Sequence, residues 1–390
     1  MNRRRFLKYA GATAAGAIGW ALGLYAFFNP QVRERYLNVT KTETSSVTRN
    51  ITQTKFVSNR EFVKAEGEQL VSGNRIFKAR GFNYYPRDYG WRIFKAWDKD
   101  EVSRELNLAS ELNCNCIRTF VNYQYSTNNV NYEQDFKTFY PVDSDYVARI
   151  QEFLDLADGH GYGVILSLFE YVYWDLLKPQ YYWIGEKYLE ELLPQFSDDP
   201  RILAWDIINE PDLKDPFSQP GGQENVTTFL KKMSQKIRDL DKNHLITVGV
   251  GRSENLSKIS DIDKFTDFIS FHDYDDPSKL RAKISTAKQF KKPVVLGEFG
   301  RHTYASDPVW PQTETDQAEC YNSVLPIVKQ TNIAGSLFWT LMDFPVANIP
   351  SALGPVYNGK ESIENHYGIY RLDYTPKPAK SVVQRFNAQY

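Results

Sequence analysis

The sequence predicts an α/β protein built on a (β/α)8 TIM barrel, a closed sheet of parallel strands with helices outside it. Short apolar runs rich in β-branched residues alternate with longer amphipathic segments, which is typical of βα units around a parallel sheet. The chain has 390 residues, enough for one barrel behind a leading segment of different character. An open doubly wound sheet is the competing architecture, but no Gly-x-Gly-x-x-Gly turn follows the first strand.

Residues 1–28 predict an export signal or a membrane anchor. Arg3, Arg4 and Arg5 precede an uncharged, Ala- and Gly-rich stretch over residues 9–28, which resembles a twin-arginine export signal and is long enough to span a bilayer. No clean cleavage site follows, so removal of the signal and its retention as an anchor both stay open. The positive-inside rule places the arginines in the cytoplasm. We therefore expect an extracellular protein, either secreted or anchored at the cell surface.

The segment after this signal changes character twice. Residues 29–55 are polar and rich in Thr and Ser, which predicts a flexible linker. Residues 56–390 have a globular pattern and predict a single domain. Short apolar runs on either side of Gly67, followed by Gly73, predict a small hairpin at the start of this domain.

Eight short apolar runs then predict the barrel strands. They cover residues 79–83, 116–120, 164–168, 203–208, 245–250, 268–272, 293–298 and 336–341. The amphipathic segments between them include residues 100–112, 145–157, 226–240 and 315–328. In the second of these, Tyr146, Ile150 and Phe153 belong to one apolar stripe, as expected of a helix that packs on a sheet. Eight such strands closing on themselves form a barrel.

Charge and cysteine content argue against two classes of protein. The chain has 47 Lys and Arg against 48 Asp and Glu, so it lacks the basic excess of a nucleic-acid-binding protein, and no nucleic-acid partner is expected. The cysteines, Cys114, Cys116 and Cys320, are odd in number and do not predict a disulfide framework. Cys114 and Cys116 lie two apart in an apolar run, so we expect them to share one face of a strand as small buried residues.

No metal or cofactor is expected. The five histidines are scattered and show neither His-x-His nor His-Glu-x-x-His spacing. The acidic group of Asp273, Asp275 and Asp276 could bind a cation, although a solvated loop is the favoured interpretation. A metal-dependent barrel hydrolase is therefore a weak alternative.

Two of the predicted strands end in a glutamate. Glu210 follows the apolar run 203–208, and Glu298 closes the run 293–298. In a barrel, catalytic groups stand at the carboxyl ends of the strands. Glycosidic cleavage needs two carboxyl groups that flank the bond, one to protonate the leaving oxygen and one to attack the anomeric carbon or activate water. Either glutamate alone could equally cap a helix or form a salt bridge, but the pair predicts this chemistry.

The sequence around both glutamates resembles a known family. Asn209-Glu210-Pro211 after one strand and Gly297-Glu298-Phe299-Gly300 after a later one are similar to clan A glycoside hydrolases, particularly family 5. The resemblance extends from about Phe62 to the C-terminus. It implies that Glu210 is the general acid/base and Glu298 the nucleophile of a retaining, double-displacement mechanism.

The resemblance also implies roles for five substrate-binding residues: Arg118, Asn209, His272, Tyr274 and Trp339. Arg118 would lie beside the nucleophile and keep it ionised, and Asn209 would bind the sugar 2-hydroxyl. Tyr274 would contact the nucleophile, His272 would line the site, and Trp339 would form a platform under the reacting sugar. The charge of Glu298 should in turn raise the pKa of Glu210.

The substrate prediction depends on one departure from the cellulase pattern. Many family 5 cellulases carry a histidine at the end of the third strand, where this chain has Ser167-Leu168-Phe169-Glu170. The mannanase branch also lacks it, and residues 80–85 resemble the mannanase opening. The resemblance thus favours an endo-β-1,4-mannanase whose partner is a β-linked polysaccharide or oligosaccharide. The alternatives are an endo-β-1,4-glucanase, a β-glycosidase, and a surface carbohydrate-binding protein without catalysis.

Overall fold

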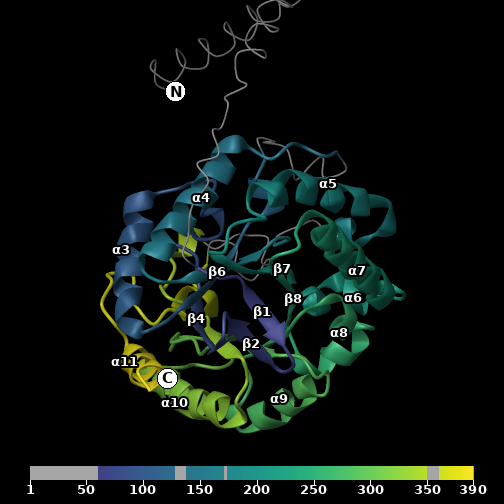
Figure 1. Ribbon diagram of the computed structural model, residues 1–390. Coiled ribbons are helices and arrows are strands. Elements are labelled where there is room, and N and C mark those ends of the chain that lie inside the picture. Colours follow the sequence, from purple (N-terminus) through teal and green to yellow (C-terminus); the bar gives the residue numbers. More distant parts are fainter. Residues whose placement is uncertain (1–59, 128–137, 171–173, 349–359, 390) are drawn as a thin grey trace, which may run out of the picture. The chain divides into compact units, whose positions relative to one another are not determined.

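Eight parallel strands close into a barrel in the computed structural model, and helices surround it (Figure 1). The strands follow chain order around the barrel, and β11 pairs with β4 to close it. Their bounds are β4 Ala79–Asn83, β5 Cys116–Phe120, β6 Gly163–Ser167, β7 Ile202–Asn209, β8 Leu245–Val250, β9 Ile269–Asp273, β10 Val294–Phe299 and β11 Gly335–Phe338. The barrel prediction is confirmed, and each predicted strand is present. Because these strands are buried on both faces, they appear in the sequence as nearly continuous apolar runs.

The structure describes residues 60–127, 138–170, 174–348 and 360–389. The described residues belong to one unit, Ser58–Tyr390. The predicted export segment, residues 1–28, and linker, residues 29–55, lie outside these ranges. Within the described ranges, no helix combines the length and apolar character needed to cross a bilayer.

The α-helices occupy the positions expected between the strands. Their bounds are α3 Lys99–Ala109, α4 Ser144–Gly159, α5 Tyr182–Leu192, α6 Asp215–Ser218, α7 Gly222–Leu240, α8 Ile262–Phe265, α9 Leu280–Lys288, α10 Glu314–Thr331 and α11 Pro378–Asn387. Side-chain caps fix several starts: Asp98 accepts from the first backbone N–H groups of α3, and Thr313 forms a capping box with Asp316 in α10. These caps satisfy N–H groups that would otherwise lack a partner.

The last barrel strand is shorter than predicted. We expected it to extend to residue 341, but β11 ends at Phe338. Beyond that point the chain bonds to a later segment instead of continuing the barrel, since the carbonyl of Leu341 accepts from the backbone N–H of Ile369 and of Tyr370. The C-terminal segment therefore replaces the neighbouring strand as partner.

A small antiparallel sheet precedes the barrel. The predicted hairpin is present as β1 Val63–Glu66 and β2 Gln69–Ser72, and a third strand, β3 Arg75–Phe77, extends it. Both turns use a glycine with positive φ, Gly67 at 59° and Gly73 at 56°. Val63 and Leu70 pack against residues near the amino ends of the barrel strands, so the sheet covers that end of the barrel.

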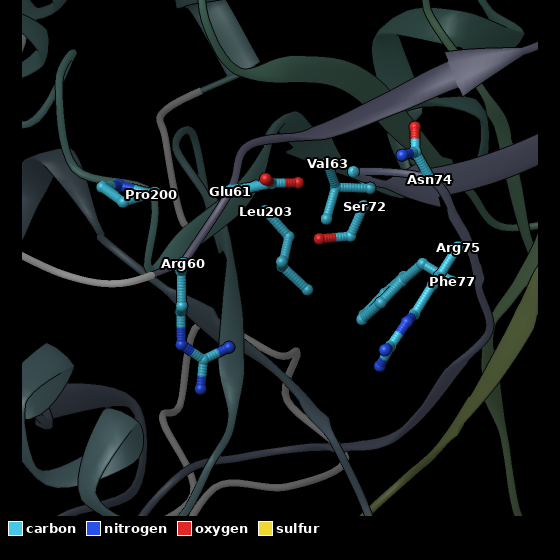
Figure 2. Close-up of a pocket in the computed structure, with 10 residues that line it drawn as sticks. Arg60, Glu61, Val63, Ser72, Asn74, Arg75, Phe77, Pro200 and Leu203 are labelled. Atoms are coloured by element: carbon cyan, nitrogen blue, oxygen red, sulfur yellow. The ribbon is translucent and has the colours of Figure 1, made fainter.

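A cavity of about 450 Å³ lies between this sheet and the start of β7 (Figure 2). Its lining includes Arg60, Ser72, Phe77 and Leu203. Because Leu203 belongs to the amino end of β7, the cavity is at the opposite end of the barrel from the carboxyl ends of the strands.

The cysteine prediction is wrong in one respect. Cys116 is buried in β5, but Cys114 precedes the strand and is only partly buried. The two side chains therefore do not share a strand face, and the thiol of Cys114 instead accepts a hydrogen bond from Asn387. All three thiols are free.

We predict that a chain beginning at Phe56 folds and keeps full activity, because the ordered sheet starts at Val63. A chain beginning at Asn74 is the matched control. It lacks Val63 and Leu70, whose burial contributes about 1.5 to 3 kcal/mol each, so it should unfold at clearly lower urea concentration. Aggregation of the chain starting at Phe56 would show that the preceding residues are part of the fold.

Candidate active site

The residues that the sequence singled out lie together at the carboxyl end of the barrel. Parallel strands present their carboxyl ends on the same face, so side chains at those ends converge. The residues in the strands are Arg118 in β5, Asn209 in β7, His272 in β9 and Glu298 in β10, and those that follow strands are Glu210, Tyr274 and Trp339.

Glu298 is held by two donors, one on each carboxylate oxygen. The guanidinium of Arg118 donates to Oε1 at 2.6 Å, and the hydroxyl of Tyr274 donates to Oε2 at 2.6 Å. Burial, followed by the charge of Glu298, raises the pKa of Tyr274 well above its usual value, so this hydroxyl keeps its proton. A carboxylate with both oxygens fixed in this way is oriented before any substrate arrives.

Arg118 is itself fixed by a buried set of acceptors. Its Nε and Nη2 donate to Asp206 Oδ2 at 2.9 and 2.6 Å, and its Nη1 donates to Asn83 Oδ1 at 2.9 Å. Its Nη2 also donates to Asn209 Oδ1 at 2.8 Å. The amide nitrogen of Asn209, which can only donate, is the group that this arrangement leaves to interact with a ligand. Sequence reasoning missed Asp206 and Asn83, although an aspartate inside an apolar strand is a visible signal.

Glu210 stands where β7 ends and has an unusual backbone conformation. Its φ of 49° and ψ of 51° lie in the left-handed region, which is strained for a residue with a side chain. Pro211 follows and begins a 3-10 turn, Pro211–Leu213. The carboxylate Oε1 of Glu210 lies 2.8 Å from Nδ1 of His272, and the same nitrogen lies 3.5 Å from Oε2 of Glu298. A single imidazole nitrogen thus lies close to both carboxylates.

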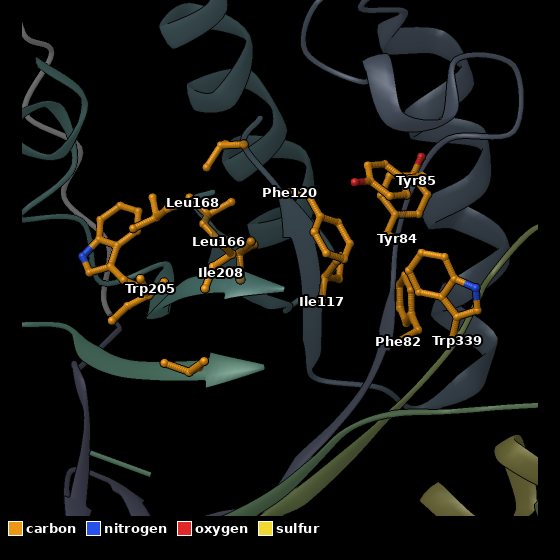
Figure 3. Close-up of a cluster of buried hydrophobic side chains, with 14 of the residues drawn as sticks. Phe82, Tyr84, Tyr85, Ile117, Phe120, Leu166, Leu168, Trp205, Ile208 and Trp339 are labelled. Carbon is orange, nitrogen blue, oxygen red and sulfur yellow. The ribbon is translucent and has the colours of Figure 1, made fainter. Parts of the chain in front are cut away.

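Trp339 follows β11 and is largely buried in an aromatic cluster. Figure 3 shows its indole beside Phe82, with the ring nitrogen on the side away from Phe82. That nitrogen donates to Oε1 of Glu364 at 2.9 Å. Sequence reasoning missed Glu364, which belongs to a short turn far along the chain, and did not assign Glu170 to the site. Burial raises the pKa of Glu170 to about 7, and the charges of both candidate catalytic glutamates act in the same direction.

The spacing of the two glutamates distinguishes two hydrolytic geometries. Glu210, His272 and Glu298 each offer an atom within 4.8 Å of the others. Retaining glycosidases place their carboxyl groups about 5 to 5.5 Å apart, whereas inverting enzymes need about 6.5 to 9.5 Å to admit a water. Because the 4.8 Å bound applies only to the nearest atoms, the carboxyl separation of about 5 to 5.5 Å that a retaining enzyme needs stays a prediction.

Residues 78–344 match the family model described as cellulase (glycosyl hydrolase family 5). The chain belongs to glycosyl hydrolase family 5. Among curated relatives, mannan endo-1,4-β-mannosidase 3 of Arabidopsis thaliana is 23% identical over 384 residues, covering 80% of this chain and 89% of that protein. Mannan endo-1,4-β-mannosidase 7 of the same plant is 24% identical over 382 residues, covering 78% and 83%.

Solved structures share the barrel. An endo-1,4-β-mannanase from Rhizomucor miehei superposes with a TM-score of 0.64 at 17% identity, covering 84% of this chain and 99% of that one. An exo-β-1,4-mannosidase from Opitutaceae bacterium strain TAV5 gives a TM-score of 0.65 at 20% identity, covering 80% of this chain. The chain spans only 60% of the length of the latter. At these identities, the likeness establishes the fold.

Family membership makes the protein a retaining glycoside hydrolase, and the site chemistry is consistent with that assignment. A divalent ion could in principle use Glu210, His272 and Glu298 as ligands. Both oxygens of Glu298 already accept hydrogen bonds, however, and one donor is the cation Arg118. A second positive charge beside that guanidinium would be repelled.

The acidic group that begins at the last residue of β9 does not behave as one solvated loop. Asp275 and Asp276 are exposed as expected, but Asp273 is buried. Lys283 bonds to Asp273 and Asp275 at 2.5 Å each, and Asp276 accepts from the backbone of Ser278. A lysine thus occupies the position that a cation would need.

The pKa that we expected for Glu210 is wrong in sign. Burial acts to raise it, but the hydrogen bond and the charge of His272 outweigh burial, and the pKa is lowered. For His272, burial acts to lower the pKa, but the charges of Glu298 and Glu210 overcome it, and the pKa is raised. The two shifts are coupled, so the proton that a general acid needs belongs to the Glu210–His272 pair and not to either residue alone.

The proton shared by Glu210 and His272 predicts the pH at which kcat/KM falls on the basic side of its profile. Below the raised pKa of His272 the pair holds the proton that a general acid needs, and the proton is lost as the pH rises through that pKa. The limb of kcat/KM should therefore lie above ~6.5, the value of a free imidazole. In His272→Asn the proton can reside only on the carboxyl of Glu210, whose usual pKa is lower than that of an imidazole, so the limb should move to lower pH by an amount that burial of Glu210 limits. The control is His160→Asn, at the end of α4. An unmoved limb would assign it to another group.

A second prediction concerns Arg118, which is 2% exposed. Arg118→Met leaves Asp206 and Glu298 buried without their shared cation, which should cost about 3 to 5 kcal/mol in the free energy of unfolding. Lys99→Met removes the cation of an exposed pair with Glu152, and should leave the free energy of unfolding nearly unchanged. Urea unfolding of both variants measures the difference. Equal losses would contradict the role of Arg118 as the charge that balances the site.

Proposed function

We propose that this protein is an endo-β-1,4-mannanase that cleaves mannan and glucomannan, with Glu298 as nucleophile and Glu210 as general acid/base. The observation that carries the catalytic assignment is the fixed carboxylate of Glu298, bonded by Arg118 and Tyr274, with a carboxyl of Glu210 close beside it. The substrate assignment is supported by the mannan endo-1,4-β-mannosidases that match most of the chain. The absence of a histidine after β6 supports it further.

The proposed reaction has two displacements. In the first, a carboxylate oxygen of Glu298 bonds to the anomeric carbon, the bond from that carbon to the leaving oxygen breaks, and Glu210 gives its proton to that oxygen. In the second, water bonds to the anomeric carbon, Glu210 takes a proton from the water, and the bond to Glu298 breaks. The configuration at the anomeric carbon is inverted twice and thus retained.

The neighbouring side chains support these roles. Arg118 and Tyr274 direct the oxygens of Glu298, Asn209 offers its amide hydrogens to the sugar 2-hydroxyl, and Trp339 supplies a flat surface under the ring. His272 delivers the shared proton to Glu210. We further propose that the arginines and the apolar stretch over residues 9–28 carry the enzyme out of the cell, where such polymers occur.

The test is a comparison of substrates. Purified protein is assayed for reducing sugar released from mannan, glucomannan, carboxymethyl cellulose and xylan, with and without a chelator. We expect mannan and glucomannan to be preferred, no effect of the chelator, and a fall in mannan viscosity that precedes most of the sugar release. Preference for carboxymethyl cellulose would indicate a glucanase, and sugar release without loss of viscosity would indicate a β-glycosidase acting on chain ends.

A further inference from the structure

We propose that Glu364 binds a hydroxyl group of the sugar that rests on Trp339. It lies in the 3-10 turn Ile363–His366, between β11 and α11, and is bonded to the indole nitrogen of Trp339 at 2.9 Å. This inference rests on the proposed function, since it takes Trp339 as the platform for the reacting sugar. It assigns to the site a third carboxyl group that the mechanism above does not use.

The turn that carries Glu364 is fixed on both sides. Ser362 and Asn365 form a capping box around it, and Asn365 is bonded through its side chain and its carbonyl to the backbone of Phe344. The carbonyl of His366 accepts from the backbone of Thr303 in the loop after β10. Glu364 is therefore held beside Trp339 by the fold, as a residue that positions a ligand must be.

The charges around Glu364 are unfavourable for a purely structural carboxyl. No cation forms an ion pair with it within the described ranges, whereas the charges of Glu298 and Glu210 are close enough to act on it. Burial and these charges raise the pKa of Glu364 to about 8. At neutral pH the group is therefore mostly protonated, and it then has one O–H donor as well as acceptor capacity.

A protonated carboxyl in this position suits a sugar hydroxyl. Its Oε1 already accepts from the indole, and the structure gives its other oxygen no hydrogen bond among the described residues. Glu364 is mostly buried but keeps some exposed surface, and its second oxygen is not among the fully buried side-chain atoms without a partner, so this oxygen can meet a ligand. A hydroxyl both donates and accepts, so it can pair with the neutral carboxyl without adding a charge near the two catalytic glutamates.

The experiment measures kcat/KM on 4-nitrophenyl β-D-mannopyranoside and on its 3-, 4- and 6-deoxy derivatives. In Glu364→Ala we expect kcat/KM for the parent sugar to fall roughly 10- to 100-fold below the wild-type value. For the deoxy sugar that lacks the hydroxyl bound by Glu364, the substitution should lower kcat/KM very little. Glu364→Gln keeps an acceptor for the indole and a donor for the sugar, so it should remain within about fivefold of the wild type and should rescue selectivity among the deoxy sugars. Glu364→Met, of similar volume, replaces the alanine variant if that variant unfolds.

Two outcomes overturn the proposal. If the alanine substitution lowers kcat/KM for all four sugars by the same factor, Glu364 acts only by holding Trp339. If wild-type kcat/KM for every deoxy sugar is within about twofold of the value for the parent sugar, the site does not bind these hydroxyls. A wild type that cleaves the aryl glucoside but not the mannoside overturns the proposed substrate alone, and the same series on deoxy glucosides then tests Glu364.

Discussion

Glu298→Ala should abolish turnover of every substrate, whatever the acidity of its leaving group. Without this carboxylate no covalent glycosyl-enzyme can form, and the general acid alone cannot replace it. We expect a loss of roughly 10⁵- to 10⁶-fold in kcat, similar to the removal of a nucleophile from other enzymes that react through a covalent intermediate. The measurement is the initial rate on mannan and on an activated aryl mannoside.

The matched control for this variant is Glu319→Ala, which removes an exposed carboxylate from α10. It should leave kcat and KM unchanged on both substrates. The catalytic variant should also remain folded, because Arg118 keeps its pair with Asp206. If Glu298→Ala is folded and retains more than about a hundredth of the wild-type rate, Glu298 is not the nucleophile.

The fold could be predicted because barrel strands have a strong local signal. A strand buried on both faces needs apolar residues at almost every position, and these runs are visible without knowledge of the partners. Two of the strand errors have different physical causes. β3 was missed because Arg75 and Ile76 are exposed, so its pattern is not apolar. β11 ends early because Thr340 and Leu341, which follow it, accept hydrogen bonds from Ile369 and Tyr370, about thirty positions further along the chain.

The site was predictable to the extent that its residues stand at strand ends. Glu210 and Glu298 interrupt or follow apolar runs, which makes them visible, and the family resemblance then supplied their neighbours. Asp206 lies inside an apolar run, where a carboxylate needs a cation as its partner, and that partner is Arg118. Glu364 had no such signal, because only the folded chain places it against Trp339.

The protonation of the acid/base pair required the three-dimensional structure. From the sequence, a negative charge beside Glu210 was expected to raise its pKa. The sign reverses because His272, 62 positions away, forms a hydrogen bond with Glu210 and lies close to both carboxylates. A pKa depends on hydrogen bonds as much as on the charges that the sequence reveals.

Glu210→Ala should fail differently from Glu298→Ala, because the general acid/base acts in both displacements. On mannan, whose leaving group needs a proton, we expect a loss of about 10²- to 10⁴-fold. An activated aryl leaving group needs little protonation, so the variant should still form the glycosyl-enzyme on Glu298. Hydrolysis of this intermediate lacks its general base and should be slow, so stopped-flow measurements should show a burst of phenolate.

Azide should then distinguish the two variants. With Glu210→Ala, the anion attacks the glycosyl-enzyme without needing a general base, so it should restore turnover and give the β-glycosyl azide. With Glu298→Ala, azide displaces the aglycone directly from the opposite face, so the product should be the α-azide. NMR of the anomeric proton identifies each product. If the two azides appear the other way round, the roles of the two glutamates are exchanged, because only a covalent intermediate on the nucleophile inverts the anomeric carbon before azide arrives.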